Sequence, residues 1–174
     1  MDAGHCRERN ERRQSLAVAT LADEHAAVGS GVMAFTAGAR WIQKAVAVDL
    51  DVPLTTETVQ QIVSWFRDRG VPPVIELTSL SDEASFAATA EAGFALVEVE
   101  NVWAMVPRAL TVEPPEGITI RRVDAADAAE VRRYAEIVAE GFTPEGEAVP
   151  EPVVESGIRS VHMDHFRAFL ALDD

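Results

Sequence analysis

The sequence has little cysteine, little basic charge and no long apolar run, and each shortage excludes a class of protein. Cys6 is the only cysteine, so neither a disulfide framework nor a cysteine zinc site can form, and this sparing use of cysteine is typical of the reducing cytoplasm. Lysine and arginine together number 15 against 29 aspartates and glutamates, which leaves a net charge of -14. A surface this acidic repels the phosphates of nucleic acids and of anionic membranes, and it favours basic partners.

Long apolar segments are missing as well. No stretch approaches the roughly 20 apolar residues of a membrane-spanning helix. Residues 1–14 are too polar to contain the apolar core of a signal peptide. We therefore expect a soluble, cytoplasmic protein that binds neither nucleic acid nor membrane. What the chain does have is 48% apolar residues over 174 positions, enough to bury a sizeable core as one domain or as two smaller units.

Helix and strand patterns alternate along the first part of the chain. Residues 8–25 have a moderately amphipathic pattern and predict a helix that a pair of glycines, Gly29 and Gly31, would end. Residues 32–36 and 41–50 are apolar runs separated by an Ala-Gly-Ala turn, which predicts a hairpin. The clearest helix covers residues 56–69. It is capped by a threonine at its start, and its apolar stripe consists of Val59, Ile62, Val63 and Phe66.

Residues 71–107 predict a strand, a short helix and a second strand. The first run, 71–77, is β-branched and apolar and predicts a buried strand that opens on two prolines. The helix begins at Ser79 or Ser81, with acidic residues in its first turn, and ends at Gly93. Residues 94–106 alternate in part between apolar and acidic side chains, which is typical of a strand with one wet face.

The second part of the chain also alternates strand and helix patterns. It follows a linker at residues 111–116, where two prolines and two glutamates lie close together. The pattern then predicts a strand and a helix whose capping box contains Asp127 and which Gly141 closes. An acidic loop, a second helix and a final apolar strand follow. The predicted ranges are 118–123 for the strand, 124–140 for the helix, 143–152 for the loop, 153–162 for the second helix and 166–172 for the final strand.

Two segments resemble a known family. The run RDRGVPPVIELTSLSDEASFAATAEAGFALVEVENVWA, with its helix ending in Arg-Gly and its Gly-Phe pair after the next helix, is similar to the rear of a GNAT-type N-acetyltransferase unit. The run GITIRRVDAADAAEVRRYAEIVAEGF resembles the first strand and helix of such a unit. The resemblance implies an α/β (α+β) fold with a mixed sheet flanked by helices. It also implies a tandem protein, with a degenerate unit at residues 1–110 and the incomplete start of a second unit at residues 117–174.

The resemblance further implies acyl transfer from acetyl-CoA to an amine, so the site that holds the cofactor matters. In this family a glycine-rich turn before a helix places backbone N–H groups around the pyrophosphate. The corresponding turn here, residues 49–57 (DLDVPLTTE), has no glycine, and Pro53 removes one donor. Asp49, Asp51 and Glu57 would repel a pyrophosphate. We therefore assign no cofactor-binding residue and expect the chain to be inactive by itself.

Other residues that could take part in catalysis or binding also have an ordinary structural interpretation. The resemblance places Phe142 at the wall of an acceptor pocket, and the adjoining loop has three glutamates that could attract an amine-bearing acceptor or could simply be solvated. Glu98 and Glu100 share a strand face, where they are candidate general bases or ordinary protection against aggregation. His162 and His165 supply too few ligands for zinc, so no metal site is predicted.

The remaining candidates leave the catalytic residues unknown. Tyr134, the only tyrosine, lies on the apolar stripe of its predicted helix and is expected in the core. The strand predicted at 166–172 has an apolar edge that needs a partner, which we expect in further sequence or in a second copy that forms a homodimer. Three hypotheses stay open. They are an inactive part of a tandem acetyltransferase, a non-catalytic GNAT-like structural or dimerisation module, and an acetyltransferase that binds acetyl-CoA despite its unusual turn.

Overall fold

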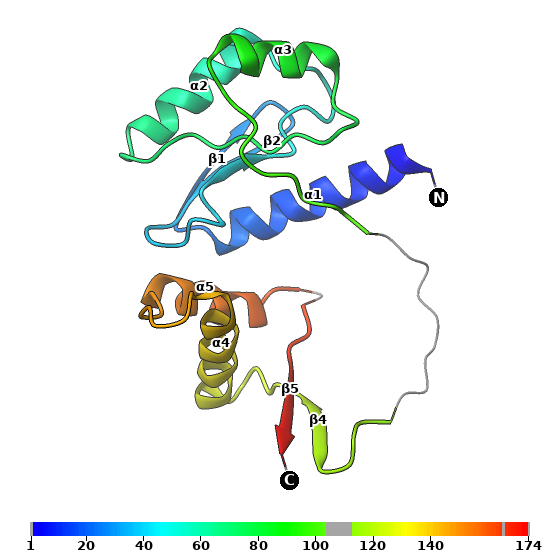
Figure 1. The fold of residues 1–174 in the computed structure, drawn as a ribbon, viewed down its shortest axis with the longest axis vertical. Coiled ribbons are helices and arrows are strands. Elements are labelled where there is room, and N and C mark those ends of the chain that lie inside the picture. Colours follow the sequence, from blue (N-terminus) through cyan, green and yellow to red (C-terminus); the bar gives the residue numbers. More distant parts are fainter. Residues whose placement is uncertain (1, 104–112, 165, 174) are drawn as a thin grey trace. The chain divides into compact units, whose positions relative to one another are not determined.

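The computed structural model describes residues 2–103, 113–164 and 166–173 (Figure 1). The chain divides into two compact units, Met1–Ala104 and Met105–Asp174. The described residues form five helices and two small antiparallel sheets, of three and two strands, so the predicted mixture of helices and strands is confirmed at the level of an α+β fold. None of the described helices is long and apolar enough to cross a membrane.

The sheet of unit 1 is a meander of three short strands. β1 (Glu24–Val28) pairs with β2 (Gly31–Phe35), and β2 pairs with β3 (Lys44–Val46), both antiparallel. The predicted hairpin between β2 and β3 is therefore confirmed. β3 is much shorter than the predicted strand 41–50, because Ala47 adopts a positive φ of 58° that ends the extended conformation.

The N-terminal helix differs from its prediction at both ends. α1 (Ala3–Leu21) begins earlier than expected because the Asp2 side chain accepts a hydrogen bond from the backbone N–H of His5 at 2.9 Å and caps the helix. It ends before β1, so the predicted end at the glycine pair is wrong. Gly29 instead lies in the two-residue turn between β1 and β2, and Gly31 is the first residue of β2. A Cβ at Gly31 would lie 1.9 Å from the Val46 carbonyl oxygen, so only glycine fits there.

Helix α2 (Thr56–Arg67) agrees closely with its prediction. The Thr55 side chain accepts from the Thr58 N–H, and the predicted stripe turns inward. Figure 1 shows α2 and α3 (Glu83–Glu91) together on one side of the β1–β2 ribbon. One buried cluster of unit 1 consists of Val28, Met33, Ala45, Val48, Leu54, Val59, Ile62, Phe66 and Ala88.

The two strands predicted around α3 are wrong in large part. Residues 71–77 form only one parallel bridge, between Ala45 and Ile75, and are mostly half-buried rather than buried. Residues 94–103 form no strand, and Val97 and Trp103 are 86% and 91% exposed. Alternation is a signal for a strand only where a neighbouring strand supplies hydrogen bonds. Residues 104–106 of the second predicted strand lie outside the described residues.

Unit 2 consists of a two-stranded sheet and two helices. β4 (Ile118–Arg122) is followed by α4 (Ala128–Phe142) and α5 (Glu151–Val161), and β5 (Phe169–Asp173) returns antiparallel beside β4. The prediction that the last strand finds its partner outside this sequence is therefore wrong for one of its two edges.

The predicted apolar stripe of α4 consists of Val131, Tyr134, Ala135 and Val138, of which Val131 and Ala135 are buried and Val138 is 36% exposed. Asp127, through hydrogen bonds to the N–H groups of Ala129 and Glu130, caps the helix, which therefore starts later than predicted. The helix also continues past Gly141 to Phe142. Two buried clusters result, one of Val123, Val131, Ala168 and Leu170 and one of Ala135, Ala139 and Val154.

Candidate functional site

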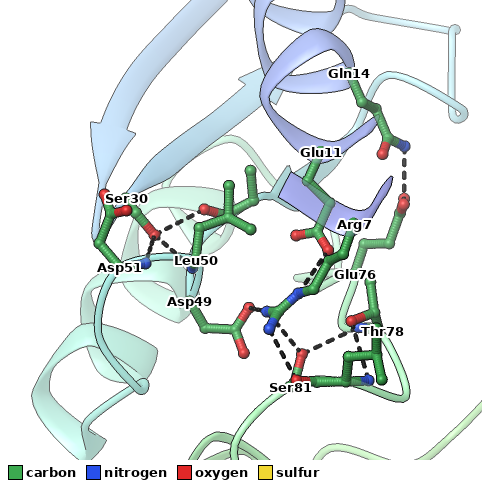
Figure 2. Close-up of polar contacts among 12 residues, drawn as sticks. Arg7, Glu11, Gln14, Ser30, Asp49, Leu50, Asp51, Glu76, Thr78 and Ser81 are labelled. Carbon is green, nitrogen blue, oxygen red and sulfur yellow. Dashed lines mark hydrogen bonds and ion pairs between the residues drawn. The ribbon is translucent and has the colours of Figure 1, made fainter. Parts of the chain in front are cut away.

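The most elaborate polar cluster in the described residues surrounds Arg7 of α1 (Figure 2). The segments that it joins start from the parallel bridge of unit 1. There, Ala45 N donates to the Val74 oxygen at 2.8 Å, and Glu76 N donates to the Ala45 oxygen at 2.9 Å. Beyond this bridge the two segments continue as residues 47–50 and 77–81. In α/β proteins, ligands commonly bind at the carboxyl ends of neighbouring parallel strands. The side chain that occupies this position in unit 1 therefore determines which ligands could bind there.

The Arg7 guanidinium lies between these two segments and bonds to both. Its Nη2 donates to Asp49 Oδ1 at 2.8 Å and to Ser81 Oγ at 3.3 Å, and its Nη1 donates to the Leu80 carbonyl oxygen at 2.8 Å. Its Nε donates to Glu11 Oε1, one turn further along α1, at 3.1 Å. A planar guanidinium has donors that diverge in one plane, and here four acceptors from three segments of the chain match them.

The cluster is buried and carries more negative than positive charge. The Asp49 side chain is fully buried, and those of Glu11 and Arg7 are 5% and 14% exposed. Burial raises the pKa of Glu11 above its usual value, and the hydrogen bond and positive charge of Arg7 oppose this increase. Asp49 Oδ2 has no hydrogen-bond partner among the described residues. Two buried carboxylates therefore depend on one cation.

The loop that presents Asp49 is fixed by the turn between β1 and β2. Ser30 Oγ donates to the Ala47 oxygen at 2.9 Å and accepts from the N–H groups of Leu50, at 2.7 Å, and Asp51, at 3.3 Å (Figure 2). A Cβ on Gly29 would lie 2.2 Å from the Val48 oxygen. The glycine pair that the sequence seemed to offer as a helix end therefore positions residues 47–51.

An outer ring of polar contacts links α1 to the same two segments. Gln14 Nε2 donates to Glu76 Oε1 at 2.8 Å, and Lys44 Nζ pairs with Glu76 Oε2 at 2.7 Å. Arg12 pairs with Asp51 at 2.9 Å, in an exposed position. A surface cavity of about 390 Å³ lies beside this ring, lined by Gly4, Arg7, Glu8, Arg12, Leu50, Asp51 and Leu80. Its charged lining is balanced, so it shows no preference for an anion.

At the turn of residues 49–57, one of the three acidic residues expected to repel a pyrophosphate has another role, because the Asp49 carboxylate is buried against Arg7. Asp49 points inward to Arg7, the Leu54 N–H donates to Ser85 Oγ at 3.0 Å, and the Thr58 N–H is taken by its cap. Two backbone donors of this turn, the N–H groups of Leu54 and Thr58, are thus bonded within the protein.

The structure does not bring the other sequence-predicted candidates together. Phe142 ends α4 and is 87% exposed, and it is not in the lining of the cavity of about 340 Å³ formed by residues 140–149. Glu98 and Glu100 are exposed in the irregular segment after α3. His165 lies outside the described residues, and no group of three or more possible metal ligands occurs among the described ones.

The expected core position of Tyr134 is confirmed in part. Its ring packs against the cluster around Val131, and burial raises the pKa of its hydroxyl.

No protein-family model, curated protein or solved structure matches this chain. The Arg7 cluster was also missed by the sequence analysis, which treated residues 1–14 as a polar end. Two signals were available: an Asp at position 2 that can cap a helix, and the spacing of four residues between Arg7 and Glu11, which places opposite charges on one helix face. Neither signal reveals the partners at positions 49, 80 and 81.

Proposed function

We propose that this chain is part of a tandem GNAT-type N-acetyltransferase and that residues 1–110 form a degenerate unit with a structural role. The observation that supports the loss of cofactor binding is the turn at residues 49–57, which has no glycine and in which Pro53 removes one backbone N–H donor. Asp49 lies at the start of this turn, and its buried carboxylate is paired with Arg7.

Element order supports the family. Unit 2 runs strand, helix, helix, strand, which is the order that opens a GNAT unit. Unit 1 runs through three antiparallel strands to α2 and then to a parallel bridge and α3, which is the order of the middle and rear of such a unit. Acetyl-CoA and an amine-bearing acceptor would then bind to sequence that follows the elements seen here, and a homodimer through β5 belongs to the alternative below.

Titration of the chain with acetyl-CoA, together with an acetyl-transfer assay on a panel of amines, tests this proposal. We expect no heat of binding at millimolar acetyl-CoA and no transfer above the rate in buffer. The Asp49→Asn variant is a matched control, because removing one charge does not supply the missing glycine turn and should not create binding. Saturable binding to the unmodified chain with a dissociation constant below about 0.1 mM, worth roughly 5 kcal/mol, would overturn the proposal.

A second candidate, a non-catalytic dimerisation module, rests on the outer face of the β4–β5 sheet. Ile120 and Phe169 are about half exposed on the same face, because Ile120 pairs with Ala171 and Arg122 pairs with Phe169. A Phe169→Lys variant would abolish association that uses this face. Sedimentation of both proteins at the same concentrations decides the question, since a monomer in both cases refutes the module and a dimer only in the original supports it.

A further inference from the structure

The acceptors around Arg7 have the properties of a binding site for a guanidinium group. Three of them, Asp49 Oδ1, the Leu80 carbonyl oxygen and Ser81 Oγ, come from outside α1 and converge on two nitrogens of one side chain. A carboxylate, a carbonyl and a hydroxyl placed around a planar fork suit a guanidinium better than an ammonium, whose three donors point in tetrahedral directions.

These acceptors are held in place by their own segments. Ser81 Oγ accepts from the Thr78 N–H at 3.1 Å, and the Thr78 side chain accepts from the Leu80 N–H at 3.2 Å, so the turn at 78–81 is closed by local bonds. The loop of Asp49 is fixed by the two bonds that Ser30 Oγ accepts from Leu50 and Asp51. The site therefore does not depend on Arg7 for its shape.

A second observation also points to a ligand. The Asp49 side chain is fully buried, yet its Oδ2 has no hydrogen-bond partner among the described residues. A buried carboxylate oxygen in this state retains unused capacity to accept a donor. Methylguanidinium has the same five N–H groups as an arginine side chain, but it is not tethered to α1, so its orientation toward Asp49 is not fixed by a bond from Nε to Glu11.

The two halves of α1 are attached in different ways. Among the described residues of the helix, the buried apolar side chains are Val18 and Leu21, both in its second half. The first half is attached through the Arg7 bonds, the exposed Arg12–Asp51 pair and the Gln14–Glu76 bond. Segments held by polar contacts with little apolar burial open locally before the core does.

We propose that Asp49, Leu80 and Ser81 form a guanidinium-binding site, that Arg7 is its internal ligand, and that this contact fastens the first half of α1 as a strap over the site. The ligand class that would compete with the strap is an arginine side chain of a basic partner, which the net charge of -14 would attract. This site is independent of acyl transfer and stands whether or not the chain belongs to a GNAT protein.

Chemical rescue of an Arg7→Ala variant tests the site. Thermal unfolding is followed by tryptophan fluorescence with 0 to about 10 mM methylguanidinium chloride, at ionic strength matched with sodium chloride. We expect Arg7→Ala to melt at least about 12 °C lower than the original, in line with a loss of about 3 kcal/mol or more, and to regain about 5 °C with the cation, as mass action predicts for a millimolar ligand. The original chain, the exposed-pair control Arg12→Ala and the double variant Arg7→Ala/Asp49→Asn should gain no more than 1 °C, taken as about the error of the shift scale. A gain in Arg7→Ala no larger than in these three overturns the site.

Hydrogen exchange on the full chain tests the strap and does not need the alanine variant to fold. In the original, amides of residues 7–14 should exchange at least about ten-fold faster than those of residues 17–21, because the first half opens locally. Arg7→Lys, which retains the charge but not the planar fork, should speed exchange in residues 7–14 by a further factor of about ten and leave residues 17–21 unchanged. Equal protection of the two halves, or a lysine variant that behaves like the original, overturns the proposal.

Discussion

Removing Arg7 should destabilise unit 1 strongly, and the loss should depend on Asp49. The Arg7→Met variant keeps much of the aliphatic length of the side chain but removes the only cation that contacts Asp49 and Glu11 in the described structure. Two unit charges about 4 Å apart interact by about 4 kcal/mol at an effective dielectric of about 20. Breaking a buried pair from one side typically costs 3–5 kcal/mol, because the remaining charge stays buried and uncompensated, and we expect about that loss in free energy of unfolding.

A double-mutant cycle separates the pair from the rest of the cluster. Asp49→Asn removes one of the two carboxylates, so in combination with Arg7→Met it should recover part of the loss. We expect a coupling free energy of about 2–3 kcal/mol between the two positions. The exposed pair offers a matched control. Arg12 and Asp51 are 47% and 59% exposed, and Arg12→Met should cost no more than about 1 kcal/mol.

Urea unfolding followed by tryptophan fluorescence is the assay. All 3 tryptophans, at positions 41, 65 and 103, lie in unit 1, so the signal reports on this unit alone. A shift of the midpoint at constant slope gives the change in stability directly. If the effects of Arg7→Met and Asp49→Asn add to within about 0.5 kcal/mol, the two side chains are not coupled, and our account of the cluster is refuted.

Two further predictions concern single positions. Burial raises the pKa of Glu11 above the ordinary 4.5, so the folded state holds the proton more tightly, and this carboxyl lowers stability as pH rises through the interval above 4.5. Glu11→Gln should therefore gain stability relative to the original from pH 4.5 to 7 in urea titrations, and a constant difference contradicts the raised pKa. Gly31→Ala should lose at least about 3 kcal/mol, because its Cβ would lie 1.9 Å from the Val46 oxygen. Gly141→Ala, in open space within α4, should be neutral or stabilising by up to about 1 kcal/mol, and equal losses at both glycines would contradict the close approach.

Helices were well predicted where local chemistry decides them. The cap at Thr55 and the stripe that contains Val59 and Phe66 act within one or two turns, so their signals are complete in the sequence. The helix predicted from residue 124 starts at Ala128 instead, because Asp127, which was expected inside the helix, is its N-cap. The strands were predicted less well, because a strand exists only if a distant segment pairs with it. Residues 94–103 show this: their alternation is clear in the sequence, but the described structure supplies them with no partner.

The sequence by itself determined the acidic charge and the presence of the helices, and it placed α2 closely. It did not determine what Asp49 does, because the residues that surround it are 42 positions earlier in the chain and about 30 later. Only the tertiary structure brings α1, the β3 loop and the turn at 78–81 around one guanidinium. The physical reason is that a charged side chain is buried only when the folded chain places its hydrogen-bond and ion-pair partners around it. Local periodicity in the sequence does not determine which distant segments come together.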